Sequence, residues 1–209
     1  MKTLAIASRK GGSGKTTTTV HVAGLADADG GCVVVDADPQ ASATAWYELR
    51  SDERPYVVAS PPDGIRGVIA TARHEGFAWS IIDTAPHNEA SIAEAMRLAD
   101  LVLIPVRPSL FDLRAAESTV NMAVALQKAV VAVITGAPPG MTGGEATIVR
   151  EARAYLRSLP VSVCETTIGQ RAAYSHALLS GSSAIEYEPG GKAARECAAL
   201  WLELKEKMQ

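Results

Sequence analysis

The stretch Lys10-Gly11-Gly12-Ser13-Gly14-Lys15-Thr16-Thr17, KGGSGKTT, decides the fold of this 209-residue chain. Its glycines allow successive backbone N–H groups to turn toward one anion, and a helix that begins at its end adds a positive dipole. Lys15 has the reach to contact the β- and γ-phosphates of a nucleotide, and the hydroxyl of Thr16 suits magnesium. The stretch therefore predicts a phosphate-binding loop and, with it, a nucleoside triphosphatase.

The start of this loop departs from the common phosphate-loop pattern. Arg9 occupies the place of the usual first glycine, and Lys10 adds a second lysine. We expect the Lys10 ammonium to point away from the phosphates that its own loop holds. A cation in that position is best used against the nucleotide of a second subunit docked face to face. The sequence therefore predicts that catalysis depends on dimerisation.

Short apolar runs alternate with helical patterns along the chain. Strands are expected at residues 4–7, 32–35, 79–82, 101–106 and 130–135, and helices at 16–28, 89–98, 113–128 and 142–159. Continuous apolar strands are typical of parallel sheets that are covered on both faces. We therefore expect an α/β fold, with a doubly wound, mostly parallel sheet and helices on both faces. The length favours a single domain over residues 1–209.

Aspartates follow two of the expected strands. Asp36 and Asp38 come at the end of one apolar run, and Asp83 ends another. In an open α/β sheet the carboxyl ends of the strands converge on the ligand crevice. We expect Asp83 to hold magnesium through water, Asp36 to face the magnesium shell, and Asp38 to position or deprotonate the attacking water. The predicted catalytic residues are Lys10, Lys15 and Asp38, and the predicted metal ligands are Thr16, Asp36 and Asp83.

Segments 10–17, 35–42 (VDADPQAS), 81–86 (IIDTAP) and 105–112 (PVRPSLFD) together resemble the ParA family of ATPases with a deviant phosphate loop. The resemblance covers nearly the whole chain and is to the short form that lacks an N-terminal helix-turn-helix domain. It implies that ATP and Mg²⁺ are the cofactors. It also implies an ATP-bound sandwich dimer that binds DNA without sequence preference and is released when a partner protein stimulates hydrolysis.

The resemblance assigns roles to individual residues as well. Lys10 would act across the dimer, Lys15 on the phosphates and Asp38 in hydrolysis. Segment 105–108 lies where the family lines the nucleobase, so Arg107 and Pro108 are expected at the base. The predicted nucleotide-binding residues are Lys10, Gly11, Gly12, Ser13, Gly14, Lys15, Thr16, Thr17, Arg107 and Pro108.

A formal net charge of -3 argues against a surface coated in positive charge, so any contact with DNA must be local. Segment 166–171, which ends in Arg171, resembles the family near its DNA-facing edge, although an ion pair between Arg171 and a neighbouring glutamate is the alternative. The predicted DNA-binding residues are Arg150, Arg153, Arg171, Lys192 and Arg195. Such contacts go to phosphates and give no sequence preference.

The cysteines Cys32, Cys164 and Cys197 lack metal-ligand spacing and favour a reducing compartment. We expect no signal peptide and no membrane-spanning segment. The expected protein is cytoplasmic and nucleoid-associated, and it forms a homodimer with ATP. Its partners would be nonspecific DNA and a ParB-like or other cargo-adaptor protein, and the cargo a plasmid, a chromosome, or an assembly such as a carboxysome or chemotaxis cluster.

Two alternative functions remain open for the same fold. A membrane-associated ATPase of the division-site type would need a basic amphipathic C-terminal tail, and Glu203 and Glu206 dilute that character. A metabolic ATP-dependent amidase or synthetase would need substrate-binding loops, for which the chain leaves little length. We therefore expect no stable membrane association.

Overall fold

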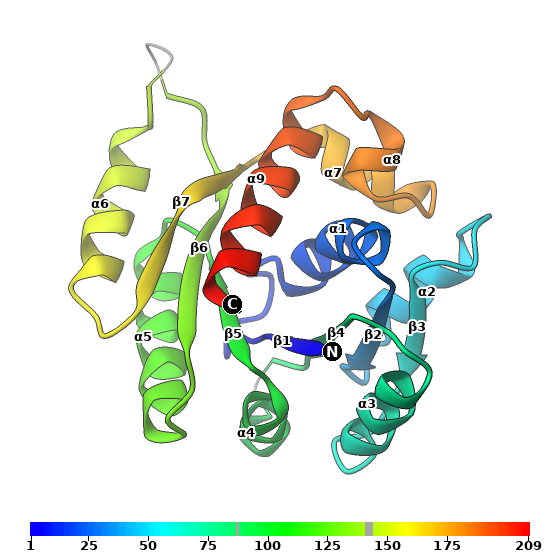
Figure 1. The fold of residues 1–209 in the computed structure, drawn as a ribbon. Coiled ribbons are helices and arrows are strands. Elements are labelled where there is room, and N and C mark those ends of the chain that lie inside the picture. The colour runs from blue at the N-terminus through cyan, green and yellow to red at the C-terminus, as the bar shows by residue number, and fades with distance from the viewer. Residues whose placement is uncertain (87, 141–143) are drawn as a thin grey trace.

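A parallel sheet forms the centre of the computed structural model, which describes residues 1–86, 88–140 and 144–209 (Figure 1). Within these residues the sheet has seven strands in the order β3-β2-β4-β1-β5-β6-β7, and each neighbouring pair is parallel. The strands are β1 (Lys2–Ile6), β2 (Cys32–Ala37), β3 (Tyr56–Ala59), β4 (Trp79–Thr84), β5 (Leu101–Val106), β6 (Val130–Ala137) and β7 (Ser162–Gly169). The predicted doubly wound parallel sheet is confirmed.

Helices cover both faces of this sheet (Figure 1). On one face lie α1 (Lys15–Ala28), α2 (Ser42–Glu48), α7 (Ala172–Leu179), α8 (Ala184–Tyr187) and α9 (Lys192–Lys207). On the other lie α3 (Ile65–His74), α4 (Glu89–Leu98), α5 (Leu110–Ala125) and α6 (Thr147–Arg157). Alternate strand residues feed the two cores, so that Val34 belongs to the first and Val35 to the second. Among the described helices, none has both the length and the apolar character needed to cross a bilayer.

The boundaries of three helices differ from those predicted, and for α1 the difference is one residue, since it begins at Lys15. Helix α5 begins at Leu110 rather than at 113, because the side chain of Ser109 accepts a hydrogen bond from the Asp112 N–H and so caps the helix, and it ends at Ala125 rather than at 128. Helix α6, predicted over 142–159, begins at Thr147 and ends at Arg157. Positions 142 and 143 of that prediction lie outside the described residues.

The edge strands β3 and β7 were not predicted from the sequence. Most residues of β3 are exposed, and exposed, half-buried and buried residues alternate along β7. An edge strand is covered less completely than a central one, so it lacks the continuous apolar run by which the central strands were recognised. The five predicted strands are all present.

Candidate active site

The phosphate loop lies at the carboxyl end of β1, beside the carboxyl ends of β2 and β4. In the strand register Ile6 of β1 pairs with Asp83 of β4, and Asp83 pairs with Asp36 of β2. Three segments that are far apart in the sequence therefore meet at the edge of the sheet that is formed by the carboxyl ends of its strands. This is the edge at which open α/β folds bind ligands.

The backbone of the loop depends on its glycines. Gly12 and Gly14 have φ values of 74° and 95°, in the left-handed region that a side chain disfavours. The hydroxyl of Thr135, at the end of β6, donates a hydrogen bond to the Ser13 carbonyl at 2.8 Å. A Cβ atom on Gly14 would lie 3.6 Å from the same hydroxyl. Thr135 thus fastens the loop to β6, a role that was not predicted, although a polar residue at the end of a buried strand is a signal for it.

The side chain of Lys15 folds back over the loop. Its Nζ donates to the carbonyl of Lys10 at 3.3 Å, and the residue is only 6% exposed. Burial lowers the pKa of Lys15, whereas the nearby charges of Asp83 and Asp38 act to raise it. A partly desolvated ammonium with one carbonyl partner has donors left over, and these suit phosphate oxygens.

Asp83 and Thr16 are in direct contact at the base of the site. Asp83 is fully buried, its Oδ2 accepts from the Thr16 hydroxyl at 2.6 Å, and its Oδ1 accepts from the Thr19 hydroxyl at 3.2 Å. Burial raises the pKa of Asp83 to about 7, and the neighbouring charge of Asp36 acts in the same direction. These oxygen donors fit Mg²⁺, which takes one or two protein ligands and completes its shell with water and phosphate.

Asp36 is committed to holding the chain that follows it. Its Oδ2 accepts from the backbone N–H and the hydroxyl of Thr44 at 2.9 and 2.8 Å, and its Oδ1 accepts from the Asp38 N–H at 3.2 Å. Asp38 is half-buried, and its Oδ1 accepts from the Gln40 N–H at 2.9 Å. The two aspartates therefore anchor and shape the turn that leads into α2. Their roles toward magnesium and water stay predictions.

Arg9 and Lys10 occupy the mouth of the loop. The Arg9 guanidinium donates to the Ser118 hydroxyl of α5 and forms an ion pair with Glu89 of α4, and its N–H donates to the Thr119 hydroxyl. In the sequence Arg9 stood out only as a missing glycine, but the residue ties the loop to two helices. Lys10 is half-buried, and within the described residues its Nζ has neither a hydrogen-bond nor an ion-pair partner. Its action across a dimer stays a prediction.

Arg107 and Pro108 directly follow β5, so they lie at the carboxyl ends of the strands, as the phosphate loop does. Arg107 is exposed, and a Cβ atom on Gly136 would lie 3.7 Å from its side chain. A cavity of about 580 Å³ begins at the next residue, Ala137, and continues along the end of β7 past Gln170. Contact of Arg107 and Pro108 with a nucleobase stays a prediction.

The structure corrects the prediction that Arg153 binds DNA. Arg153 is 8% exposed, and its guanidinium donates to the carbonyls of Cys164 and Glu165 and, at 2.6 Å, to the hydroxyl of Thr167. It also pairs with Glu145 at 2.8 Å. With all these partners inside the protein, the side chain fastens α6 to β7 and is not free to reach a phosphate.

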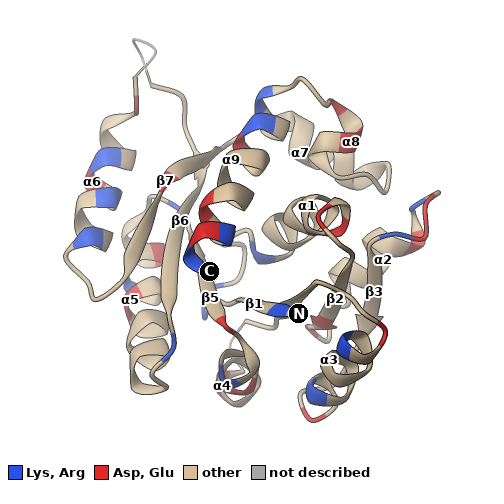
Figure 2. Cartoon of the chain, viewed as in Figure 1, with Lys and Arg blue, Asp and Glu red and all other residues tan. Residues whose placement is uncertain are grey.

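The other predicted DNA-binding residues are more accessible. Arg171 realises the alternative raised above, because its Nε donates to Glu196 Oε1 at 2.9 Å. Arg150 on α6, and Lys192 and Arg195 in the first turn of α9, are exposed. Figure 2 shows Lys and Arg on α6 and at the amino-terminal end of α9. Contact of these residues with DNA stays a prediction.

Comparison with known proteins places this site in a family. Residues 4–184 match the model described as the CobQ/CobB/MinD/ParA nucleotide binding domain. "Maintenance of carboxysome distribution protein A" of Gloeobacter kilaueensis is 30% identical over 208 residues, which cover 99% of this chain and 94% of that protein. The protein of the same name from Halothiobacillus neapolitanus is 28% identical over 200 residues, covering 93% and 91%.

A solved structure agrees with these sequence matches in fold. Cyanothece apo McdA superimposes with a TM-score of 0.80 at 19% sequence identity, and the match covers 100% of both chains. The family model begins in β1 and ends at the start of α8, so it includes the phosphate loop and all three aspartates. The chain therefore belongs to the CobQ/CobB/MinD/ParA family, as one of its ParA-type ATPases.

Proposed function

We propose that this chain, a single domain over residues 1–209, is a positioning ATPase that dimerises with ATP and distributes or segregates a cargo inside the cell. The observation that carries the proposal is the cluster at the phosphate loop, where the buried Lys15 and Asp83 lie beside each other and Asp83 accepts a hydrogen bond from the half-buried Thr16. Two relatives are named for the maintenance of carboxysome distribution. A protein assembly of that kind is therefore the cargo we favour over a plasmid or a chromosome.

Hydrolysis in this proposal depends on alignment and charge neutralisation, because phosphoryl transfer has a loose transition state. The loop N–H groups and Lys15 hold the β- and γ-phosphates. Thr16, Asp36 and Asp83 would hold Mg²⁺, whose charge offsets that of the phosphates. Asp38, the more accessible aspartate, orients the attacking water.

A second copy of the chain completes the site. Lys10 lies at the mouth of the loop with its ammonium unpaired among the described residues, so it is available to a nucleotide opposite. Leu110 and Phe111, in the loop-side turn of α5, are 66% and 75% exposed. Adjacent large apolar side chains on a surface favour a protein interface. We propose that this face meets its own copy when ATP is bound.

DNA is the proposed track, and the dimer would double the cationic surface. Arg150, Lys192 and Arg195 carry the contacts in this proposal, while Arg171 joins them only if its pair with Glu196 opens. Phosphate contacts of this kind release counterions, so affinity falls as salt rises. The protein would then be cytoplasmic and associated with the nucleoid, and a partner protein would release it by stimulating hydrolysis.

The packing of α9 favours this function over a membrane-associated one. Cys197, Leu200, Trp201 and Leu204 of α9 are buried in the core on the α1 face of the sheet. An interfacial helix must offer its apolar face to lipid. In this chain that face is already covered by the protein.

The substitution Asp38→Ala tests the proposal. We expect ATP affinity within about threefold of wild type, since Asp38 does not hold the phosphates, and turnover reduced by at least about 100-fold, since the water is no longer oriented. Light scattering after gel filtration in ATP and Mg²⁺ should show a dimer that persists longer than that of wild type. Turnover equal to wild type, or monomers at every nucleotide concentration, would contradict the proposal.

A further inference from the structure

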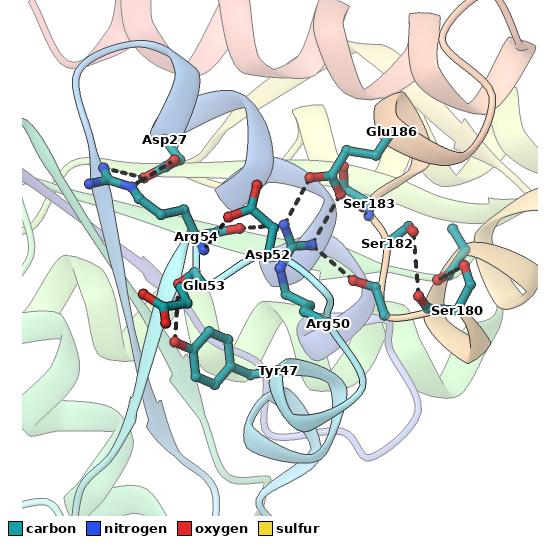
Figure 3. A network of polar contacts seen from close by, with 12 residues as sticks. Asp27, Tyr47, Arg50, Asp52, Glu53, Arg54, Ser180, Ser182, Ser183 and Glu186 are labelled. Atoms are coloured by element: carbon teal, nitrogen blue, oxygen red, sulfur yellow. Dashed lines mark hydrogen bonds and ion pairs between the residues drawn. The ribbon is translucent and has the colours of Figure 1, made fainter.

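Arg50 is a buried arginine between the end of α2 and the turn that joins α7 to α8 (Figure 3). Its side chain is 3% exposed. Its Nη1 donates to the Gly181 carbonyl at 2.9 Å, and its two terminal nitrogens donate to both carboxylate oxygens of Glu186 at 3.1 and 2.9 Å. Its Nη2 also donates to the Arg54 carbonyl, whereas its buried Nε has no partner among the described residues. Because a buried guanidinium is costly unless its donors are bonded, these contacts of the two terminal nitrogens fix the relative positions of the segments closely.

Further contacts join the carboxyl end of α2 to the same turn. The indole N–H of Trp46 donates to the Ser182 carbonyl at 3.2 Å, and the Arg50 guanidinium lies 4.7 Å from the centre of the Trp46 ring. Gly181 packs closely against Leu49, because a Cβ atom on Gly181 would lie 2.5 Å from the backbone carbonyl of Leu49. The end of α2 and the α7–α8 turn are therefore packed as one unit.

The amino end of α2 carries the aspartate loop of the site. Asp36 accepts two hydrogen bonds from Thr44, and the Ala41 N–H donates to the Asp38 carbonyl at 2.8 Å. Ala41 itself has a φ of 52°, a left-handed conformation that a non-glycine residue adopts only when its surroundings hold it there. With seven residues, α2 is about 10 Å long. A shift at its carboxyl end therefore reaches the Asp38 turn.

The first residue of α8, directly after the α7–α8 turn, contacts the helix that starts at the phosphate loop. The N–H of Ala184 donates to Nδ1 of His21 on α1 at 3.1 Å. Helix α1, which begins at Lys15, and helix α2, which follows Asp38, are thus both hydrogen-bonded to residues 182–184, more than 130 residues away in sequence.

We propose that Arg50 is a positioning residue for ATP hydrolysis. By bonding Gly181 and Glu186 it holds α2, and through α2 it holds Asp38 at its place opposite the phosphate loop. The inference rests on the proposed role of Asp38. It makes the α7–α8 turn part of the control of hydrolysis, although the turn lies outside the loop that binds phosphate.

The test compares Arg50→Lys and Glu186→Gln with a matched control, Arg54→Lys. Arg54 pairs with Asp27 at 2.7 Å in the same network (Figure 3). Asp27 accepts from the N–H of Cys32, which lies at the opposite end of β2 from Asp36. We expect both test variants to lower kcat about tenfold with KM for ATP within twofold, because only alignment is lost. The control should keep kcat within twofold of wild type.

Hydrogen exchange supplies a second readout, which shows whether the effect of Arg50 reaches the Asp38 turn. The amides of Ala41 and Thr44 should exchange faster in Arg50→Lys and Glu186→Gln, and at the wild-type rate in Arg54→Lys. If Arg50→Lys does not fold, Glu186→Gln decides the question, since it keeps the size of the side chain.

Two results would overturn the proposal. One is a kcat for the folded test variants that matches the Arg54→Lys control, and the other is a raised KM with kcat unchanged. Asp38→Ala is measured alongside to separate the role of Arg50 from that of Asp38. If Asp38→Ala is inactive while the test variants keep full turnover, only the positioning role of Arg50 fails. If Asp38→Ala turns over like wild type, the proposed hydrolytic role fails and the inference with it.

Discussion

Two regions of this protein bury charged groups and use them in opposite ways. At the phosphate loop, Lys15 has one carbonyl partner, and Asp83 is buried deeply enough to raise its pKa to about 7. At the junction of α6 and β7, Arg153 is as well buried as Lys15, but its guanidinium has carbonyl, hydroxyl and carboxylate partners. Lys15 therefore has N–H donors left over for a ligand, whereas the donors of Arg153 are already bonded within the protein.

The difference teaches how to separate function from stability among buried charges. A buried charge with few partners costs stability, and a ligand that supplies the missing partners recovers it. A fully paired one holds two elements together, and breaking it leaves the remaining partners unsatisfied. Variants at the loop should therefore change binding more than stability, and variants at Arg153 should do the reverse.

The largest expected effect is that of Lys15→Ala on nucleotide binding. Removal of the ammonium that we propose to contact the phosphates should weaken ATP affinity at least about 1000-fold, or about 4 kcal/mol. The free energy of unfolding without nucleotide should change by less than about 1 kcal/mol, because a desolvated charge with one partner is removed. Calorimetric titration and urea unfolding measure the two quantities. Equal ATP affinity in Lys15→Ala and wild type would refute the assignment of the site.

Arg153→Leu should give the mirror image of that result. The carbonyls of Cys164 and Glu165 lose a donor, and Glu145 loses its ion pair, so we expect the free energy of unfolding to fall by about 3 kcal/mol. ATP affinity should stay within twofold of wild type. Arg150→Ala on the same helix is the control, since that side chain is exposed and should cost less than about 0.5 kcal/mol. A stable Arg153→Leu protein with weaker ATP binding would reverse the comparison.

The same contrast explains how much of this molecule could be predicted from its sequence. The loop and the aspartates were placed at one edge because strand ends and a glycine turn are local features, and parallel topology then brings strand ends together. The partners of Arg153 depend on the packing of α6 against β7, and the partner of Arg171 depends on the packing of α9 against the end of β7. No local sequence pattern encodes either packing. Spacing alone made Arg153 resemble a surface cation.

Thr135 and Arg9 were missed for a related reason. Each secures the phosphate loop to an element more than 80 residues away in sequence, so their roles appear only when the sheet order is known. The edge strands escaped prediction because exposure breaks their apolar pattern. The positions of the motif residues could therefore be predicted from the sequence, whereas the contacts that support them became visible only in the fold.

His21 sharpens the comparison because it is buried, lies near the loop and is neutral. Burial lowers its pKa to about 4 from an ordinary value of 6.5, and the smaller effect of the Glu186 charge opposes this, while the Tyr174 ring lies 5.0 Å away. The folded state therefore binds fewer protons, so its stability is complete above pH 6.5 and falls as pH drops toward 4.

Replacing His21 by glutamine should remove that dependence. Glutamine can still accept from the Ala184 N–H, but it does not titrate. Between about pH 7 and pH 4.5 we expect wild type to lose roughly 2–3 kcal/mol more than His21→Gln, as measured by urea unfolding at each pH. Parallel losses in the two proteins would show that other groups dominate acid unfolding.

The smallest effect is expected for exposed cations, which belong to neither buried class. Lys192→Ala with Arg195→Ala should leave stability and ATP affinity unchanged, and should weaken binding to nonspecific DNA several-fold at physiological salt. The slope of log affinity against log salt should become shallower by about 1 for each phosphate that the protein no longer neutralises. The matched control is Arg66→Ala with Arg97→Ala on α3 and α4, which removes the same charge from the opposite face of the sheet. If both double variants change the salt dependence equally, only overall charge matters, and no cationic surface at α9 recognises DNA.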